Sequence, residues 1–283
     1  MAGEVTTTAT TMNDVVYAAI ITDRILMELR PYNVSRPLFR WAAAGPSKVY
    51  NFPTQDDEGV ATTGVAEADD FTTETAISTN VAQVTAGEVA MRADVSDFLV
   101  KISILDTLPH VAGILARGLA EAFETDACAL YDDFSNVTTA ASTLTPADWL
   151  DAMSALEQRD VVGSLVSVLH PKQAGELRQE LAASGASIFV NGGAGIVQPN
   201  LEGSVGSLFG VPIFQSSLVV ETSGLKGGAM FVRNEALGAY EIWGPRVELQ
   251  RDASARATEV VATQCYGVGE ISDTRGQEID SVA

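Results

Sequence analysis

The residues between Val49 and Met91 constrain the fold most, because their pattern predicts strands that cannot stabilise themselves. This stretch contains eight acidic residues and no lysine or arginine. Across residues 48–102, patches of apolar and polar alternation flank a middle rich in Gly, Thr, Ala and Asp, which predicts a long hairpin or extended loop. If half of the stretch runs out and half runs back, the ribbon reaches roughly 60 Å at about 3.3 Å per residue. An isolated two-stranded ribbon is only marginally stable in water, so we expect it to lie on another molecule, most economically a neighbouring copy.

The net charge excludes one class of function. The chain has 37 acidic and 17 basic residues, giving a formal charge of -20. Such a chain repels phosphate backbones, whereas tight DNA binding requires clustered lysines and arginines. Binding a genome by affinity is therefore not expected. Enclosing a genome remains compatible with this charge, because confinement needs no attraction to the wall.

The composition is typical of a globular protein with one large or two small domains, since 46% of the 283 residues are hydrophobic and 19% are charged. No run of about 18 or more apolar residues could span a bilayer. The first residues include an acid where a signal peptide carries positive charge. We therefore expect no membrane span and no secretion signal. Cys128 and Cys265 form no CxxC motif and are predicted to be reduced core residues.

The clearest helix is predicted over residues 107–132. Thr107 can cap its N-terminus, and Pro109 suits the first turn. At about 1.5 Å per residue it makes a rod of roughly 37 Å, which we interpret as a structural spine. Before it, residues 1–11 predict a mobile or partner-ordered arm, and residues 13–30 predict a helix that ends before a proline. The spine has one apolar face, formed by Leu108, Val111, Ala112, Leu115, Leu119, Ala122, Phe123 and Leu130.

A second helix is predicted to begin at Thr145, which can cap it. Asp148 is placed to accept hydrogen bonds from the unpaired N–H groups of the first turn. We expect its buried edge at Leu150, Met153 and Leu156.

The rest of the chain predicts an α+β or α/β core whose last third is mostly β. The apolar strand SLVSVLH leads directly to a helix from Pro171 through Leu181. Residues 183–210 predict a Gly-rich loop. Four strands follow, in VPIFQSSLVV, AMFVR, GAYEIWGPRVELQRD and ATEVVATQCYGVGEI.

Residues that could carry out chemistry are scarce. The two histidines, His110 and His170, each lie beside a proline, and His170 is expected to cap or pack at a strand-to-helix junction. The chain has no GxSxG pentapeptide and no phosphate-binding GxGxxG or GxxxxGK[ST] motif. Its acidic runs do not have the spacing of an EF-hand. We therefore predict no catalytic, cofactor-binding or metal-binding residue, no cofactor, and no enzymatic activity.

The order of these segments resembles a major capsid protein of tailed bacteriophages, the Johnson fold, over nearly the whole chain. The individual motifs are short, and their order and spacing carry the resemblance. They are an N-terminal arm, an extended loop entered through GPSKVYNFPT, the spine helix, the His170–Pro171 junction, LFGVPIFQSS, and the closing AMFVRNEALGAYEIWGPRVELQRD and TEVVATQCYGVGEI.

The resemblance implies an α+β fold with four regions. These are an N-terminal arm at 1–45, an extended loop (E-loop) at 46–96 that lies over an adjacent subunit, a peripheral domain at 97–140 and 241–283, and an axial domain at 141–240.

The resemblance also implies a function. Copies of the chain would assemble as hexamers and pentamers into the icosahedral head shell of a virion. The shell would enclose double-stranded DNA without sequence-specific binding, and would form in the host bacterial cytoplasm. Scaffolding, portal and decoration proteins are further possible partners. Lys–Asn crosslinking between subunits, which some members use, is not carried over, because the stretch from Val49 to Met91 contains no lysine.

The acids of the E-loop lead to a hypothesis about contacts between subunits, in which they face arginines of a neighbouring copy. Ion pairs at the rim of an interface mainly set register and association rate. The predicted contact residues are Asp56, Asp57, Glu58, Asp69 and Asp70 on the loop, and Arg36, Arg40, Arg246 and Arg251 on the neighbour.

Two other functions stay open. The same fold forms bacterial nanocompartments of the encapsulin type, which enclose a cargo enzyme. A different class would be a small hydrolase or ligand-binding α/β protein that works as a monomer or dimer. Large closed particles distinguish the shells from the last class, and the particle contents distinguish the two shells.

Overall fold

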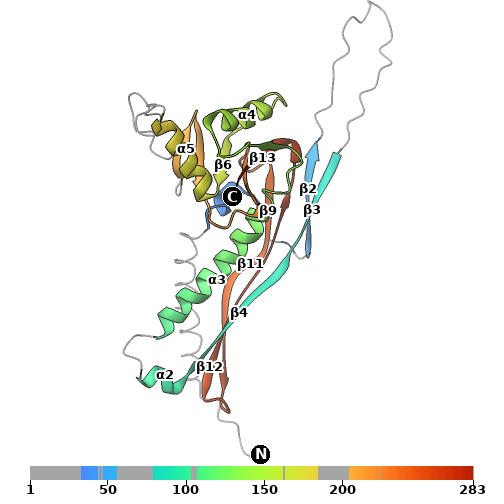
Figure 1. The fold of residues 1–283 in the computed structure, drawn as a ribbon. Helices are drawn as coiled ribbons and strands as arrows, with labels where there is room; N and C mark the ends of the chain where they lie inside the picture. The colour runs from blue at the N-terminus through green and yellow to red at the C-terminus, as the bar shows by residue number, and fades with distance from the viewer. Residues whose placement is uncertain are drawn as a thin grey trace, which may run out of the picture.

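The computed structural model describes residues 33–43, 45, 47–55, 79–102, 107–161, 163–183, 204–222 and 224–282. Within these residues the chain forms two larger sheets, a separate two-stranded hairpin and four α-helices (Figure 1). The α-helices are α2 (Asp97–Ile102), α3 (Thr107–Ala129), α4 (Pro146–Glu157) and α5 (Pro171–Ala183), with short 3-10 turns at Arg36–Leu38 and Asp273–Arg275.

The four-stranded sheet has the order β1-β11-β12-β4. Its two inner strands, β11 and β12, are long and antiparallel and pair from Leu237↔Glu270 to Asp252↔Ala257. The strands are β1 (Arg40–Ala42), β4 (Gly87–Ser96), β11 (Leu237–Asp252) and β12 (Ala257–Glu270).

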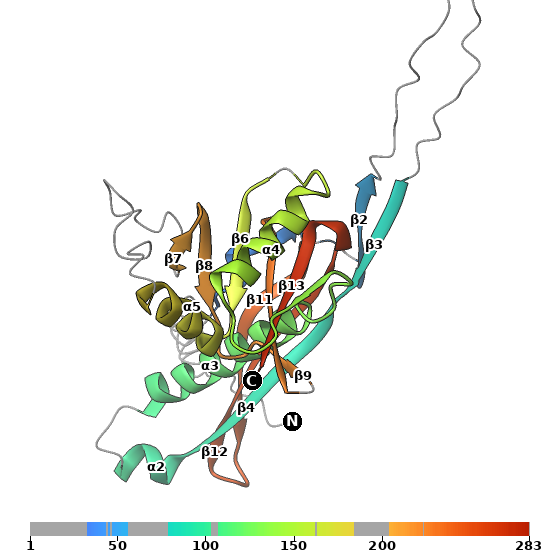
Figure 2. The ribbon, with the colours of Figure 1, turned by 45° about the horizontal axis from the view of Figure 1, so that its top comes forward.

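The seven-stranded sheet has the order β5-β13-β10-β6-β8-β7, with β9 pairing to β10. Helices α4 and α5 cover one of its faces (Figure 2), where Trp149, Leu177 and Ile279 belong to one buried cluster. The strands are β5 (Val137–Thr139), β6 (Leu165–Leu169), β7 (Ser204–Leu208), β8 (Val211–Gln215), β9 (Glu221–Thr222), β10 (Leu225–Val232) and β13 (Gly276–Val282).

The predicted spine is α3, and it packs on both sheets. Leu115 and Leu119 are buried against Val260 of the four-stranded sheet. Further along, Phe123 joins a core that includes Phe231 of the seven-stranded sheet. The predicted apolar face is confirmed in part: Ala112, Leu115, Leu119 and Phe123 are buried, whereas Val111 and Ala122 are half-buried. The helix ends at Ala129 and not at residue 132 as predicted, so the half-buried Leu130 lies beyond it.

The capping prediction for α4 is confirmed, but its buried edge was predicted partly wrong. Thr145 and Asp148 form a reciprocal capping box. The buried residues are Trp149, Ala152 and Leu156, whereas Leu150 is 38% exposed. Leu150 follows Trp149 by about 100° around the helix, and the larger ring takes the core position.

Several other predictions can be compared with the structure. The strand before His170 and the helix from Pro171 are both present, and His170 Nδ1 accepts a hydrogen bond from the Lys172 N–H at 3.2 Å. Both cysteines are buried and free, as predicted. The arm at 1–11, the helix at 13–30 and the loop tip at 56–78 lie outside the described residues.

The Gly-rich loop predicted at 183–210 is wrong at its end, because residues 204–208 form β7. A two-residue turn, Phe209–Gly210, joins β7 to β8, and both of its residues have positive φ, 50° and 85°. Two left-handed residues suit the twist of a tight hairpin. In this uncommon conformation the Phe209 ring stacks on Trp149, with 6.1 Å between ring centroids.

The predicted ribbon begins as a real hairpin. Strands β2 (Val49–Gln55) and β3 (Thr79–Thr85) pair antiparallel over their full length. Its inner face is buried on the chain's own body, where Tyr50 stacks on Tyr240 at 5.3 Å. The chain after β3 belongs to the body, because β4 pairs with β12 and residues 97–102 form α2 instead of continuing the ribbon.

Sheet pairing divides the chain differently from the expected ranges near its C-terminus. Strand β13 lies in the seven-stranded sheet beside β10, although 241–283 was grouped with the spine helix. Strand β5 pairs with β13 in the same sheet. The division into peripheral and axial domains stays a prediction.

The two glycines in the Tyr-Gly-Val-Gly segment of β12 are explained by a close contact with the hairpin. A Cβ atom on Gly267 would lie 2.4 Å from the backbone oxygen of Thr85, and one on Gly269 would lie 2.8 Å from a methyl group of Val84. Two glycines therefore let the hairpin lie directly against β12.

We expect Gly267→Ala to lower the free energy of unfolding by about 1–3 kcal/mol, because the added methyl group collides with backbone that cannot rotate away. Urea denaturation of the unassembled chain measures this. Gly87→Ala is the matched control, since a Cβ there meets nothing within 4 Å. Equal stability of the two variants would contradict the close-approach explanation.

Candidate subunit-interface residues

Arg36 is held by its own chain. Its guanidinium forms an ion pair with Glu241 of β11. The same group lies 4.5 Å from the centroid of the Trp41 ring. Arg36 therefore fixes the segment before β1 onto β11, and its availability to a neighbour is reduced.

Arg251 and Arg246 also have partners in their own chain. Arg251 donates two hydrogen bonds to the Asp97 carboxylate, at 2.7 and 2.5 Å, and this pairing lowers the pKa of Asp97. Arg246 donates to Thr263 at 3.1 Å, and its guanidinium lies over the Trp243 ring. Both arginines stabilise the four-stranded sheet.

Arg40 is the predicted contact residue that is best placed to receive a partner. It is exposed, and its guanidinium lies 5.9 Å from the Phe52 ring centroid. Within the described residues no acid pairs with it. It lines a cavity of about 430 Å³ beside the end of β2 that leads to residue 56, together with Thr54, Arg275 and Glu235, and this acid pairs with Arg275. The predicted acids at positions 56–58, 69 and 70 lie outside the described residues, so their pairing stays a prediction.

A buried polar network anchors the described part of the N-terminal segment to the spine helix. The Glu124 carboxylate accepts hydrogen bonds from Ser35 N–H at 3.0 Å and from Ser35 Oγ at 2.8 Å. Tyr131 donates to the same Ser35 oxygen at 2.7 Å. Burial raises the pKa of Glu124. This network fixes the point at which the chain enters the body.

A carboxyl cluster of Asp132, Glu278 and Asp280 was missed by sequence reasoning. Their oxygens lie within 4.8 Å of one another, and Thr222 donates to Asp132 at 2.8 Å. Gly227 gives the carboxyl groups room, because a Cβ there would lie 3.0 Å from Asp132 Oδ1. No local motif signals the whole cluster: Glu278 and Asp280 are two residues apart on β13, but Asp132 follows α3 and is distant from them in the sequence.

The cluster holds protons tightly. Burial, and then the neighbouring acids, raise the pKa of Glu278 to about 9, and burial also raises the pKa of Asp280. Carboxylate oxygens are ligands for hard cations. However, acids alone do not define a metal site, and shared protons account for their proximity.

The comparison of the chain with family models decides its family. The model described as "Phage capsid protein" matches residues 90–276, about two thirds of the chain. The chain belongs to this phage capsid protein family. It is therefore a structural phage capsid protein. No curated protein sequence matches this capsid protein significantly.

Solved structures show the fold of the capsid protein, and three are representative. The capsid of Cyanophage P-SCSP1u has 15% identity over 88% of both chains with a TM-score of 0.67. The capsid of Ralstonia phage GP4 has 12% identity over 87% of both chains, also with a TM-score of 0.67. The SrpI encapsulin of Synechococcus elongatus PCC 7942 has 14% identity over 93% of this chain and 88% of that one, with a TM-score of 0.64.

These likenesses confirm the predicted α+β fold, which is that of tailed-phage capsid proteins. Among the described residues of the capsid protein, no helix is long and apolar enough to cross a membrane.

We expect Glu278→Gln to flatten the pH dependence of stability of the capsid protein. The folded chain keeps a proton on Glu278 up to about pH 9, while the unfolded chain releases it near the ordinary value of 4.5. The wild type therefore loses stability as pH rises between these values, by at most about 1.4 kcal/mol per pH unit. Gln cannot ionise, so this loss should shrink.

Chemical denaturation from pH 5 to pH 9 measures the effect. Asp151→Asn, on the exposed side of α4, is the control and should keep the wild-type slope. An unchanged slope for Glu278→Gln would show that the cluster does not titrate as a buried unit.

Proposed function

We propose that this capsid protein assembles with copies of itself, as hexamers and pentamers, into the icosahedral head shell of a tailed phage that encloses double-stranded DNA. The family match and the capsid fold support this proposal. The structural observation that supports assembly is the exposed face of the hairpin. Only the inner face of the hairpin is buried on the chain's own body, and Val81 on the outward face is 58% exposed. A two-stranded ribbon is only marginally stable by itself, so cover of this outward face by a neighbouring copy would stabilise it.

We assign the roles of the regions in the same proposal. The N-terminal arm is 1–45. The E-loop at 46–96 contacts an adjacent subunit outside the parts of β2, β3 and β4 that pack on their own chain. The axial domain at 141–240 meets its copies around the symmetry axes. The peripheral domain, at 97–140 and 241–283, carries the spine helix that packs on both sheets.

Other partners belong to the proposal too. The charge of -20 supports enclosure of DNA without sequence-specific binding. Scaffolding, portal and decoration proteins are further proposed partners of such a shell. The shell would assemble in the host bacterial cytoplasm and become part of the virion.

Arg40 is our candidate receiver for the acidic E-loop of a neighbour. It lines the cavity beside the end of β2. Within the described residues no acid pairs with Arg40, because Glu235, which lines the same cavity, pairs with Arg275. Exposed ion pairs of this kind act mainly on the association rate and weaken with salt.

We expect Arg40→Glu to slow shell assembly by about tenfold at low salt, because it replaces attraction to the acidic loop by repulsion. Time-resolved light scattering measures the rate. Arg178→Glu on the exposed side of α5 makes the same charge change away from the hairpin and should have little effect. Adding Asp69→Lys and Asp70→Lys to Arg40→Glu should restore the rate. Equal slowing by both arginine variants, or no recovery, would contradict the pairing.

Shell formation itself is tested by size-exclusion chromatography with light scattering and negative-stain imaging of the large particles. We expect closed, uniform particles. A 29.8 kDa monomer that stays protease-resistant and never assembles would contradict the proposal and favour the ligand-binding class.

A bacterial nanocompartment is the second candidate, because the SrpI encapsulin aligns with 93% of this chain. Particle contents separate the two. Packaged DNA supports the phage head, whereas a co-purifying cargo enzyme in particles without DNA supports the nanocompartment.

A further inference from the structure

Helix α2 has an unusual surface. None of its six residues is buried. Phe98 is 72% exposed and Ile102 is 59% exposed, and Leu99 and Val100 are each nearly half exposed. Four of its six residues are large and apolar, and a helix with so much apolar surface is normally covered. This is the densest group of exposed large hydrophobic side chains among the described residues. Exposed apolar patches mark interaction sites, so we expect a partner to cover this one.

The helix is held firmly despite this exposure. Asp97 at its start forms two hydrogen bonds with Arg251, and the Asp97 N–H donates to the Arg256 carbonyl at 3.0 Å. The Leu99 N–H donates to Ser96 Oγ at 3.2 Å. The apolar side chains are therefore presented by a backbone fixed to the sheet.

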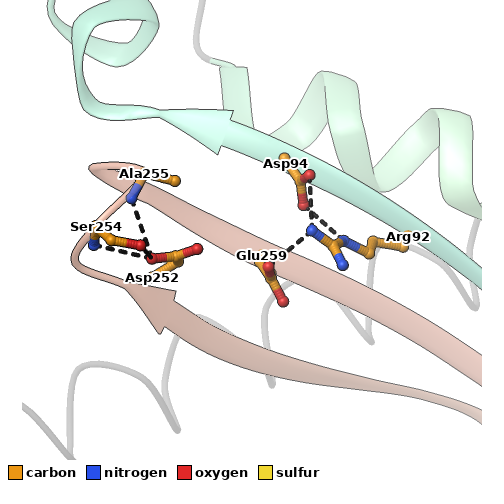
Figure 3. A network of polar contacts seen from close by, with 6 residues as sticks. All are labelled: Arg92, Asp94, Asp252, Ser254, Ala255 and Glu259. Atoms are coloured by element: carbon orange, nitrogen blue, oxygen red, sulfur yellow. Dashed lines mark hydrogen bonds and ion pairs between the residues drawn. The ribbon is translucent and has the colours of Figure 1, made fainter.

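The adjoining end of the four-stranded sheet is also braced by polar contacts (Figure 3). Arg92 donates to Asp94 at 2.8 Å and, across the strands, to Glu259 at 2.7 Å. Asp252 closes the β11–β12 turn by accepting hydrogen bonds from Ser254 and Ala255. We call residues 92–102 and 251–259 together the tip. Figure 1 shows it at the opposite end of the molecule from the hairpin.

The tip differs from the rest of the chain in charge. It contains four acids (Asp94, Asp97, Asp252 and Glu259) and four bases (Arg92, Lys101, Arg251 and Arg256), so its formal charge is zero, while the whole chain carries -20. Copies of so acidic a chain repel one another at short range. Two tips can approach without that cost, and an apolar centre with a mixed-charge rim is the usual composition of an interface.

Two of the four bases at the tip remain available to a partner. Within the described residues, neither Lys101 nor Arg256 forms an ion pair with an acid of its own chain. Both lie close enough to Asp97 to help lower its pKa. A second tip would bring its acids to these two bases.

We propose that the tip is a self-association surface, in which α2 of one copy packs against α2 of a second copy while Lys101 and Arg256 face acids of the partner tip. This inference rests on the proposed assembly of copies into a shell and names one contact within it. The other candidate occupants of α2 are the hairpin of another copy, residues 1–32, or a different protein.

Cysteine crosslinking in assembled particles tests the contact. Val100→Cys and Ile102→Cys place exposed thiols on α2, and Leu150→Cys places one on exposed α4 as the control. The two native cysteines are buried, and burial raises the pKa of Cys128 to about 12, so both should stay unreactive. With a short bismaleimide reagent, we expect most chains of either α2 variant to shift from monomer to covalent dimer, while the control stays monomeric.

The outcomes separate this inference from the proposed function. Intact shells without α2-to-α2 dimers would overturn the inference and leave the shell assignment standing. Crosslinking of Val100→Cys only when Val81→Cys is also present would assign α2 to a neighbour's hairpin instead. Crosslinks within one chain, or to a different protein, would equally overturn it.

Phe98→Ser provides a second measurement without thiol chemistry. It should lower the yield of shells several-fold at equal monomer stability, whereas Leu150→Ser should leave the yield unchanged. Equal yields from the two variants would overturn the inference.

Discussion

The packing of α3 across both sheets is the interaction on which the rest of the structure depends. Its N-terminal half buries Leu115 and Leu119 on β12, and its C-terminal half buries Phe123 and Ala127 in the core shared with the seven-stranded sheet. One rigid rod therefore fixes the relative positions of two sheets that have no strand in common. Glu124, in the same rod, also receives the entering chain at Ser35. The two sheets also meet in this core, where Phe231 of one sheet and Ala239 of the other belong to the same buried cluster as Phe123.

The surfaces that extend beyond this core have different physical characters. The hairpin carries its aromatic residues inward and continues into a strongly acidic segment. The tip has a formal charge of zero and carries the exposed apolar side chains of α2, and most of its charged groups pair with one another. An acidic subunit that meets its copies requires places where repulsion is offset, and the tip and the cavity beside Arg40 are two such places. The first would act mainly through apolar burial and the second through charge attraction, so salt should weaken the second contact more than the first.

Sequence reasoning succeeded where a single element carries its own signal. The 3.6-residue periodicity after Thr107 predicted the spine, and Thr145 with Asp148 predicted a capping box that is present. Sequence reasoning failed where neighbouring residues compete for one buried position, and where a strand depends on pairing with another segment. Trp149 displaces Leu150 from the buried edge of α4, and residues 204–208 form a strand only because β8 folds back on them. The arginines predicted to contact neighbours exist as exposed or half-exposed groups, but most already pair within the chain, which no spacing rule reveals.

The sequence by itself determined most of the element types, the absence of a recognisable catalytic motif, the formal charge of -20, and the order of segments that resembles tailed-phage capsid proteins. These follow from local periodicity and composition, which are properties of contiguous residues. Only the tertiary structure decided which distant residues meet: Glu278 with Asp132, Gly267 with Thr85, and Arg251 with Asp97 at an exposed α2. Those contacts depend on strand order and register, which are set by packing of the whole chain and not by any one segment.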